Sequence, residues 1–521
     1  NKSIASMKPQ EAVELTNFFP RPTHVETRLG SEQYAIIERE SVKTLATWRG
    51  PTGEQQLLCT TTAGFYNMSF GGTFTDPSIA RYAARTNGKH QWEQFGDGTN
   101  NWLIMVNGVD KPIYYNGAAV VLVDGVTSPA ITGLTTTDLV GLAVFKERLL
   151  FIRNNKLGFD YLPAGAAGGA ASYFDLSSVA NFGGYLMAVA IWSRDAGDGP
   201  DDYAVFITSQ GEALVYQGTD PSSATTWSLI GTYKIGKPIG RKCVLKYGAD
   251  PLILTENGVF PLSSLLTAGD ERERFAVSYN IQDAFTAASA TTLSTYGWTL
   301  TSYPEQDMLL VNVPKREDGP HDQFVMNTIS KAWCKFTGWD AEDFVAHNRT
   351  LYYCKGDTIY RAWINTTDEY RVLMHGTAGI YPTGRPIVHT ARMSFQEWGT
   401  PAVKQPLMFM PLLESTRSAP YAAGIDTDFQ LKPFSSTLVD VDSTVARWSV
   451  SKWGQSRWGA SGSLHRRWQG VEAWPGRWLA GKIQLRSSTR QTLYEWVYSS
   501  QAPVLAKWSG SVIRYTIGNS T

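Results

Sequence analysis

Four aspartates gather in one short loop and raise the question of a metal site. They stand at Asp195, Asp198, Asp201 and Asp202, within SRDAGDGPDD. Carboxylate oxygens at this density are hard ligands of the kind that Ca²⁺ takes. The loop lacks the D-x-D-x-D-G spacing and the distant Glu of an EF-hand, so we expect a solvated turn whose Asp side chains accept hydrogen bonds from nearby amides. Calcium binding stays open as the alternative.

A second set of residues combines positive charge with indole rings. Near the C-terminus a basic residue precedes Trp five times, in Arg447-Trp448, Lys452-Trp453, Arg457-Trp458, Arg467-Trp468 and Arg477-Trp478. Steps of five and ten residues fit neither the strand period nor the helical period, which indicates successive loops that each present one Trp. Three roles stay open: cation–π stacking within the chain, a subunit interface, where Trp and Arg are enriched, and stacking on nucleic acid.

The other titratable residues offer no catalytic, cofactor-binding or metal-binding motif. No GxSxG, Walker or GxGxxG sequence occurs. The adjacent carboxylates of Glu342-Asp343 and Asp201-Asp202 would face opposite sides of a strand, which is poor geometry for acid–base catalysis. We therefore predict a protein that is not an enzyme and needs no cofactor or metal. The histidines show no HxH or HExxH spacing and stand at His24, His90, His321, His347, His375, His389 and His465.

The strands that carry these residues recur along the chain. Seven times an apolar strand turns at Gly or Asn and returns as a strand rich in aromatics, starting at Leu57, Leu103, Leu149, Ala204, Leu252, Leu309 and Leu351. The starts are 46, 46, 55, 48, 57 and 42 residues apart, close to the length of a four-stranded propeller blade. One blade cannot bury both faces of its sheet, so neighbours such as Leu103 and Ile104 are expected to face opposite packed sides.

The pattern predicts an all-β fold with three parts. Residues 1–48 form an arm with a ring-closing strand, residues 49–375 form a β-propeller of about seven blades, and residues 376–521 form a Trp-rich β-sandwich or barrel-like domain. Alternating strands such as GKIQLRS and SVIRYTIG support this last domain. Short helices are expected only from Ile281 and near Leu265.

Composition narrows the class of protein. Lys plus Arg and Asp plus Glu are 47 each in 521 residues, so no global basic field is present to hold nucleic acid and any DNA contact must be local. The most hydrophobic stretch, LVGLAVFKERLLFI, has charges in its middle and predicts two strands, not a membrane span. The start lacks the apolar core of a secretory signal, which favours folding in the cytoplasm. Buried thiols, not disulfides, are expected at Cys59, Cys243, Cys334 and Cys354.

Six segments resemble, in order, a bacteriophage structural family that forms the tail nozzle or tail hub of short-tailed phages (podoviruses), the packaged-DNA stabilisation type. The similarity covers roughly residues 15–365. It rests on LTNFFPRPTHVETRLG, GLAVFKERLLFI before YLP, AVFITSQGEALVYQGTDPSSATTW, IGKPIGRKCVLKYGADPLILTENGVFPLS, NVP at residues 312–314, and QFVMNTISKAWCKFTGW.

This resemblance implies a structural virion protein. Such proteins form a homo-oligomeric ring, commonly a hexamer, below the portal and its adaptor or head-to-tail connector, and contact other tail proteins such as fibres or a needle. Double-stranded DNA is retained and then passes through the lumen during ejection, without sequence specificity. The implied location is the virion tail, after assembly in the host bacterial cytoplasm. A formal net charge of +0 suits a conduit, because a strongly basic lumen would hold the DNA back.

A sialidase-like or lectin-type carbohydrate-binding propeller is the competing interpretation. Ser193-x-Asp195-x-Gly197 matches half of an Asp-box turn, a hairpin closure of sialidase-type propellers. An enzyme of that type needs several such boxes, with clustered arginines and a Tyr–Glu pair at the axis. The sequence contains one half-box and lacks the WD or kelch signatures of cellular scaffold propellers.

Overall fold

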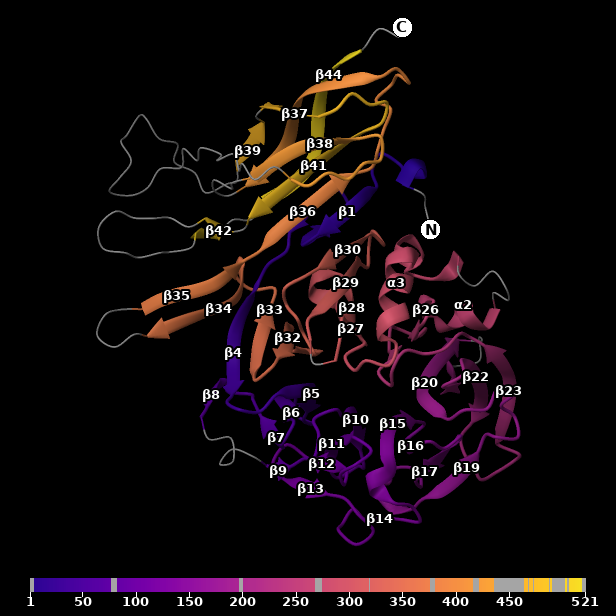
Figure 1. Ribbon diagram of the computed structural model, residues 1–521. Helices are drawn as coiled ribbons and strands as arrows, with labels where there is room; N and C mark the ends of the chain where they lie inside the picture. The colour runs from indigo at the N-terminus through magenta and orange to yellow at the C-terminus, as the bar shows by residue number, and fades with distance from the viewer. Residues whose placement is uncertain are drawn as a thin grey trace. The chain divides into compact units, whose positions relative to one another are not determined.

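The computed structural model is built almost entirely of strands and divides into two units (Figure 1). Unit 1 comprises Asn1–Gln33, Gln323–Trp339 and Arg361–Thr521, and unit 2 comprises Tyr34–Asp322 and Asp340–Tyr360. The structure describes residues 4–75, 82–195, 200–267, 274–317, 319–374, 380–415, 421–434, 463–466, 468–471, 473–486, 488–489, 502–503 and 506–517.

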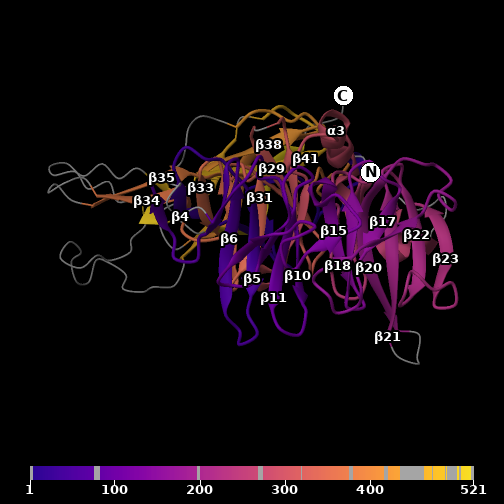
Figure 2. The same cartoon turned by 90° about the horizontal axis from the view of Figure 1, so that it is seen from below.

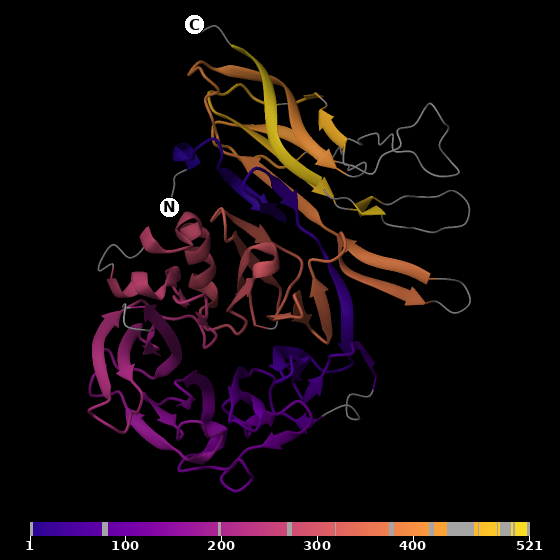
Figure 3. The same ribbon diagram turned by 180° about the vertical axis from the view of Figure 1, so that it is seen from behind.

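Unit 2 is a propeller whose sheets follow one another around a ring, as the colour sequence from indigo to orange shows (Figures 1 and 3). The first two blades are β5 (Val42–Arg49), β6 (Gln55–Thr61), β7 (Gly64–Asn67), β9 (Ala83–Ala84), and β10 (Gln91–Gly96), β11 (Asn101–Val106), β12 (Ile113–Tyr115), β13 (Val120–Leu122). The third and fourth are β15 (Leu139–Phe145), β16 (Arg148–Arg153), β17 (Gly158–Tyr161), β19 (Ser172–Asp175), and β20 (Leu186–Asp195), β21 (Pro200–Thr208), β22 (Glu212–Gly218), β23 (Trp227–Lys234). The fifth is β24 (Val244–Leu245), β25 (Leu252–Thr255), β26 (Gly258–Pro261).

The propeller has five self-contained blades, not the seven that the repeat count predicted. The repeats from Leu309 and Leu351 do form strands, β28 (Met308–Pro314) beside β27 (Thr299–Tyr303), and β32 (Thr350–Lys355) between β31 (Asp343–His347) and β33 (Thr358–Ala362). These strands belong to sheets with more members than a blade. A hairpin repeat specifies only a local pair of strands. Which further strands pair with the edge of that hairpin depends on segments far away in the sequence, and the repeat does not encode them.

The innermost strands lie in one circuit. Contacts run from β5 to β10, β15, β20, β24, β27, β31 and back to β5. In Figure 2 the long axes of β5, β10, β20 and β23 run in about the same direction, as expected of strands around a common axis. Because each innermost strand directly precedes a repeat hairpin in the chain, the residues just before these strands gather at one end of the ring.

Apolar side chains between neighbouring blades hold the ring together. On β11, Leu103 packs toward the first blade with Trp48 and Phe65, whereas Ile104 packs toward the third blade with Leu149. The predicted alternation of neighbouring residues between packed faces is confirmed there. Burying one such side chain contributes roughly 1.5–3 kcal/mol relative to leaving it exposed. The stability of each blade therefore depends on its neighbours.

Other local predictions can be compared directly with the structure. The helices near Leu265 and Ile281 are confirmed as α2 (Leu262–Thr267) and α3 (Gln282–Thr292). The hydrophobic stretch from Leu139 forms the antiparallel pair β15 and β16, as predicted. All four cysteines are buried thiols. In the part of the chain that the structure describes, helices are too short or too polar to cross a bilayer.

Unit 1 contains two sheets that share one core. One has the order β30 (Trp333–Phe336), β1 (Ala12–Thr16), β36 (Val388–Met393), β41 (Leu479–Arg486), β38 (Tyr421–Thr427). The other has the order β2 (Phe18–Pro20), β3 (Val25–Thr27), β44 (Ala506–Ile517), β37 (Lys404–Ser415), β39 (Ser463–Arg466). Phe18, Phe409 and Ile483 are fully buried in the core between them. The remaining strands of the two units are β4 (Ser31–Ile37), β8 (Gly72–Phe74), β14 (Ile131–Thr132), β18 (Gly169–Ala170), β29 (His321–Asn327), β34 (Thr367–Met374), β35 (Ile380–Pro386), β40 (Gln469–Gly470), β42 (Ser488–Thr489) and β43 (Ala502–Pro503); of these, β8, β14 and β18 belong to unit 2.

The units do not follow the predicted boundaries of 1–48, 49–375 and 376–521. Residues 34–48 belong to unit 2, and Gln323–Trp339 belongs to unit 1. The arm strand β1 pairs in parallel with β30 through Thr16 and Lys335. A parallel pair between segments more than 300 residues apart leaves no periodic signal in the sequence, so the boundary could not be placed from the repeats.

A buried cluster of charges in unit 1 joins three strands to the segment before residue 435. Asp426 on β38 is fully buried; its Oδ1 lies 2.7 Å from the Lys482 Nζ of β41, and its Oδ2 pairs with Arg392 of β36. Lys482 also donates to the carbonyls of Lys432 (2.8 Å) and Pro433 (3.0 Å). Burial lowers the pKa of Lys482, although the hydrogen bond to Asp426 opposes this. We call these residues the Asp426 cluster.

Candidate functional site

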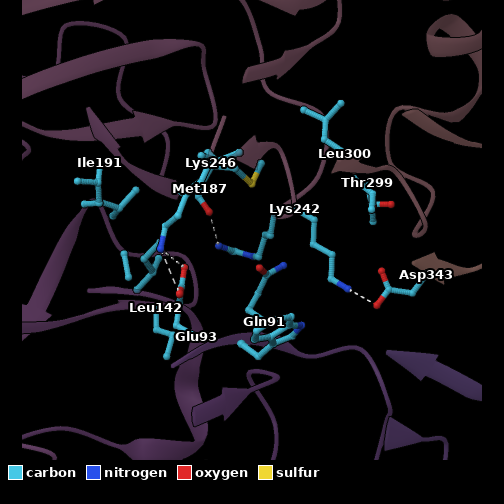
Figure 4. Close-up of a pocket in the computed structure, with 18 of the residues that line it drawn as sticks. Gln91, Glu93, Leu142, Met187, Ile191, Lys242, Lys246, Thr299, Leu300 and Asp343 are labelled. Atoms are coloured by element: carbon cyan, nitrogen blue, oxygen red, sulfur yellow. Dashed lines mark hydrogen bonds and ion pairs between the residues drawn. The ribbon is translucent and has the colours of Figure 1, made fainter. Parts of the chain in front are cut away.

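The innermost strands of unit 2 surround an axial cavity of about 230 Å³ (Figure 4). Its wall comes from β10, β15, β20, β27 and β31, together with the residues around β24. Apolar and polar side chains both line it, and several of the polar ones are charged. Its lining includes Glu93, Leu142, Met187, Arg241, Lys242, Lys246, Thr299 and Asp343.

Asp343 is the centre of the polar contacts in this cavity. Its Oδ2 accepts hydrogen bonds from the Lys242 Nζ at 2.8 Å and from the Leu45 amide of β5 at 3.0 Å. Its side chain is 5% exposed, and that of Lys242 is 17% exposed. Burial opposes the charge on Lys242, but the carboxylate of Asp343 outweighs it and raises the pKa of the lysine. One carboxylate thus joins β31, β5 and the segment before β24.

Arg241 spans the cavity wall without a carboxylate partner among the described residues. Its Nη1 donates to the carbonyls of Leu186 (3.3 Å) and Met187 (3.4 Å), at the start of β20. Its guanidinium lies 5.4 Å from the ring centre of Tyr185. Burial lowers the pKa of Arg241, yet a guanidinium keeps its proton at any physiological pH. This cation therefore holds backbone in place and keeps donors free.

A third charged contact, between Lys246 and Glu93, is solvated. The Lys246 Nζ lies 3.1 Å from Glu93 Oε1, and the side chains are 62% and 27% exposed. Pairs this exposed contribute about 0–1 kcal/mol. Figure 4 shows the Lys246–Glu93 and Lys242–Asp343 pairs as separate contacts on different parts of the wall.

The charged side chains of the axial cavity hold neighbouring segments in place, and each of its two carboxylates already has a lysine partner. Among the described lining residues, Glu93 and Asp343 each accept a hydrogen bond from an ammonium group. The lining has one arginine and no tyrosine among those residues, whereas the sialidase-like alternative needs several arginines and a Tyr–Glu pair. What this geometry does chemically is to fix neighbouring strands by charge.

The segment that contains the four aspartates begins on β20 and ends on β21, two strands that pair antiparallel. The backbones of Arg194 and Ser193 pair with Asp201 and Asp202, and Asp202 Oδ1 accepts from the Ser193 hydroxyl at 2.5 Å. This contact is with a hydroxyl, and the predicted hydrogen bonds from amides to the Asp side chains stay a prediction. Asp198, and the side chains of Asp195 and Asp201, lie outside the described residues. Where residues are described, no group of three or more His, Cys, Asp or Glu side chains is placed to hold a metal ion.

The basic-Trp series lies mostly outside the described residues. Described are Trp468, whose exposure is 39%, and the pair Arg477-Trp478. The amides of Arg477 and Trp478 donate to Asp428 Oδ1 at 2.8 and 3.0 Å, and the Trp478 ring lies 5.5 Å from that of Phe429. This last pair is thus held within the chain. Outside the described residues are Arg447, Trp448, Lys452, Trp453, Arg457, Trp458 and Arg467.

Sequence reasoning missed Lys242 and Arg241 and considered Asp343 only beside Glu342. In the structure the two neighbouring carboxylates have different partners, because Glu342 pairs with Lys43 at 2.7 Å and Asp343 pairs with Lys242. The signal that could have found them is positional, because Asp343 begins the innermost strand β31 and Arg241 and Lys242 stand just before the innermost strand β24. Which starts face one another depends on closure of the ring.

Comparisons with known proteins give weak structural likenesses only. Neither a scan of protein-family models nor a search of curated proteins finds a match to this chain. Similar solved structures include Chaetomium thermophilum Raptor (12% identity, TM-score 0.37, 65% of this chain and 29% of that chain). Others are the Myceliophteria thermophila Cps50 (Swd1) β-propeller domain (9%, 0.37, 65% and 99%) and a Bacillus subtilis glycoside hydrolase family 43 arabinoxylan arabinofuranohydrolase (9%, 0.25, 98% and 97%). At these TM-scores the likenesses carry no argument about function.

Proposed function

We propose that this chain is a structural virion protein, the tail nozzle or hub of a short-tailed bacteriophage, and that it is not an enzyme. In this role, copies of the chain assemble into a closed ring, about a hexamer, below the portal adaptor. The ring retains the packaged double-stranded DNA and then lets it pass at ejection. The proposal starts from the six ordered sequence segments that resemble this family.

The observation that carries the proposal is the use of charge on the propeller axis. Asp343 accepts from Lys242 and from the Leu45 amide, and Arg241 donates to carbonyls at the start of β20, so each of these groups holds neighbouring segments of the ring. A catalytic pocket instead needs a nucleophile or an acid–base pair held ready for substrate. Axial groups that fix the ring favour a scaffold that resists force, as a conduit for DNA must.

Unit 1 supplies the second part of the proposal. We take its two sheets, with Phe18, Phe409 and Ile483 between them, as a β-sandwich that carries the basic-Trp segment. Trp and Arg are the anchor residues of many protein interfaces, and a heterologous contact that closes on itself forms a ring. In the proposed assembly this segment meets a neighbouring copy or another tail protein, such as a fibre or needle.

The test is assembly. Light scattering and negative-stain electron microscopy of the purified chain, alone and with its adaptor ring, should give closed rings of about six copies. Replacing Trp453 and Trp458 together with Ala should weaken assembly by about 2–4 kcal/mol per true hot spot and leave propeller unfolding unchanged. A matched control is Phe70→Ala, which removes an aromatic that is 98% exposed in unit 2.

Two results would overturn the proposal. One is a chain that stays monomeric both alone and with the adaptor. The other is turnover of a glycoside substrate that is lost in an Asp343→Asn or Glu93→Gln variant, which would assign the axial cavity to the carbohydrate-active alternative.

A further inference from the structure

A second, smaller cavity of about 190 Å³ opens beside the axial one, at the end of the ring where the innermost strands begin. Gln91, Arg241 and Lys242 line both cavities. The rest of its wall comes from the residues before β10, after β11 and before β27. Its other lining residues are Lys89, His90, Asn107, Val140, Gly240, Thr295, Tyr296, Gly297 and Trp298.

We propose that this cavity is a binding site for a tetrahedral oxyanion of the phosphate class, held by Arg241, Lys242 and Lys89. Among the described residues its lining has three cations and a histidine, and neither Asp nor Glu. Charge-assisted hydrogen bonds from Arg and Lys to phosphate oxygens are short and strong. The site is independent of the proposed function and needs no second copy of the chain.

Arg241 has the donors that such a ligand needs. A guanidinium has five N–H donors in a fixed fork, and the only hydrogen bonds that Arg241 makes to described residues leave from Nη1, at 3.3 and 3.4 Å. Its Nε and Nη2 have no protein acceptor there. This fork matches two oxygens of a phosphate.

The two lysines keep donor capacity as well. Lys242 uses one contact for Asp343, at 2.8 Å. Lys89 lies 2.7 Å from Glu317, in a pair whose side chains are 38% and 53% exposed, and 4.8 Å from the ring centre of Tyr296. An ammonium has three donors, so each lysine can bind an anion without leaving its carboxylate.

His90 gives an independent sign of an unfilled polar site. The residue is 2% exposed and lines the cavity, and among the described residues its Nδ1 has no hydrogen-bond partner. A buried polar atom without a partner is uncommon in a folded protein and calls for an explanation. A neutral imidazole with its proton on Nδ1 donates to an anion.

The surrounding charges leave a positive excess. Arg85 and Lys242 act on His90 as cations and Asp110 acts as an anion. Asp343 pairs with Lys242, and Glu317 pairs with Lys89. These groups, together with Lys89 and Arg241, make four cations and three carboxylates, which leaves one net positive charge. The cavity therefore attracts an anion and repels a metal cation.

Isothermal titration calorimetry with inorganic phosphate at low salt tests the site directly. We expect saturable binding with a dissociation constant of about 0.1–1 mM and a melting temperature that rises with phosphate. Arg241→Gln should weaken binding about tenfold, with Arg241→Lys between the two because it keeps the charge and loses the fork. The matched control is Lys246→Gln, a cation that lines only the axial cavity, which should change affinity less than about twofold.

The source of the oxyanion is read from two further titrations, with a phosphomonoester and with a dinucleotide phosphodiester. Tighter binding of either, lost in Arg241→Gln, supports the site and assigns the ligand to a small metabolite or to a nucleic-acid backbone. Absence of saturable phosphate binding, or equal binding by the parent and a folded Arg241→Gln variant, would refute the proposal. Neither result depends on whether the chain forms a ring.

Discussion

The axis of unit 2 and the Asp426 cluster of unit 1 use the same device in different surroundings. Each places one buried carboxylate against cations from other strands. Asp426 is fully buried, and Lys482 donates to it and to two carbonyls. Asp343 instead faces a cavity of about 230 Å³ and pairs with one lysine. The first cluster is saturated, and the second keeps donor capacity beside an open space.

This difference indicates what each region is built for. Hydrogen bonds that use every donor fix one geometry, and removing one partner leaves a buried charge unpaired. The Asp426 cluster is thus a structural anchor for the chain before residue 435. Arg241 on the axis keeps free donors, which suits a ligand. Variants that remove one charge at a time test whether the two regions differ in this way.

The largest effect is expected for Asp426→Asn. The change leaves Lys482 buried without a counter-charge and removes one of the two carboxylates that Arg392 contacts, so the free energy of unfolding should fall by about 3–5 kcal/mol. Urea unfolding at pH 7 measures it, and hydrogen exchange should place the loosening in β38 and β41. Glu414→Gln, an exposed carboxylate of the same unit, is the control and should change stability by less than about 0.5 kcal/mol. Equal effects of the two variants would show that the cluster is no anchor.

A smaller effect is expected for Asp343→Asn. The amide oxygen of Asn can still accept from Leu45, and Lys242 gains water from the cavity, so the loss should be about 2–3 kcal/mol. Faster hydrogen exchange should appear in β5 and β31, the strands that Asp343 joins. Glu93→Gln breaks the more exposed pair on the same cavity and should lose about 0–1 kcal/mol. If Asp343→Asn matches this control, the axial ion pair does not hold the ring.

The smallest effects come from pH and concern one buried histidine in each unit. Burial lowers the pKa of His90 to about 4 and that of His389 to about 3. In the unfolded chain these histidines have a pKa of about 6.5, so below that pH the unfolded chain binds protons that the folded chain does not. The free energy of unfolding therefore falls as pH drops from 6.5 toward 4 for His90 and toward 3 for His389. Each of the two histidines should lower the free energy of unfolding by about 2 kcal/mol at pH 5.

Variants separate the two histidines. In His90→Phe and His389→Phe, the drop in unfolding free energy between pH 7 and pH 5 should shrink by about 2 kcal/mol relative to the parent. We compare the change in the free energy of unfolding between pH 7 and pH 5, not its value at one pH. Contacts that a variant loses at both pH values, such as the 2.6 Å hydrogen bond from His389 Nδ1 to the Asn17 carbonyl, then cancel. An unchanged drop would mean that the histidine titrates normally in the folded state.

The sequence determined the local structure of this protein. Apolar strands with Gly or Asn turns specify hairpins because strand periodicity and turn chemistry act over a few residues, so the hairpin of β25 and β26 was predictable. The helices α2 and α3 were predictable from their local residue pattern. The placement of Leu103 and Ile104 on opposite faces follows from the period of two. The propeller class followed from the spacing of the repeats.

Tertiary structure decided the number of self-contained blades, the boundaries of the two units and the composition of both charge clusters. Lys242 and Asp343 are 101 residues apart, and Asp426 and Lys482 are 56 apart. Their pairing depends on how the ring closes and which strands join a sheet edge. Those outcomes depend on packing and on burial of charge between distant segments, where a change in pairing alters every contact at once. No periodic pattern along the chain records them.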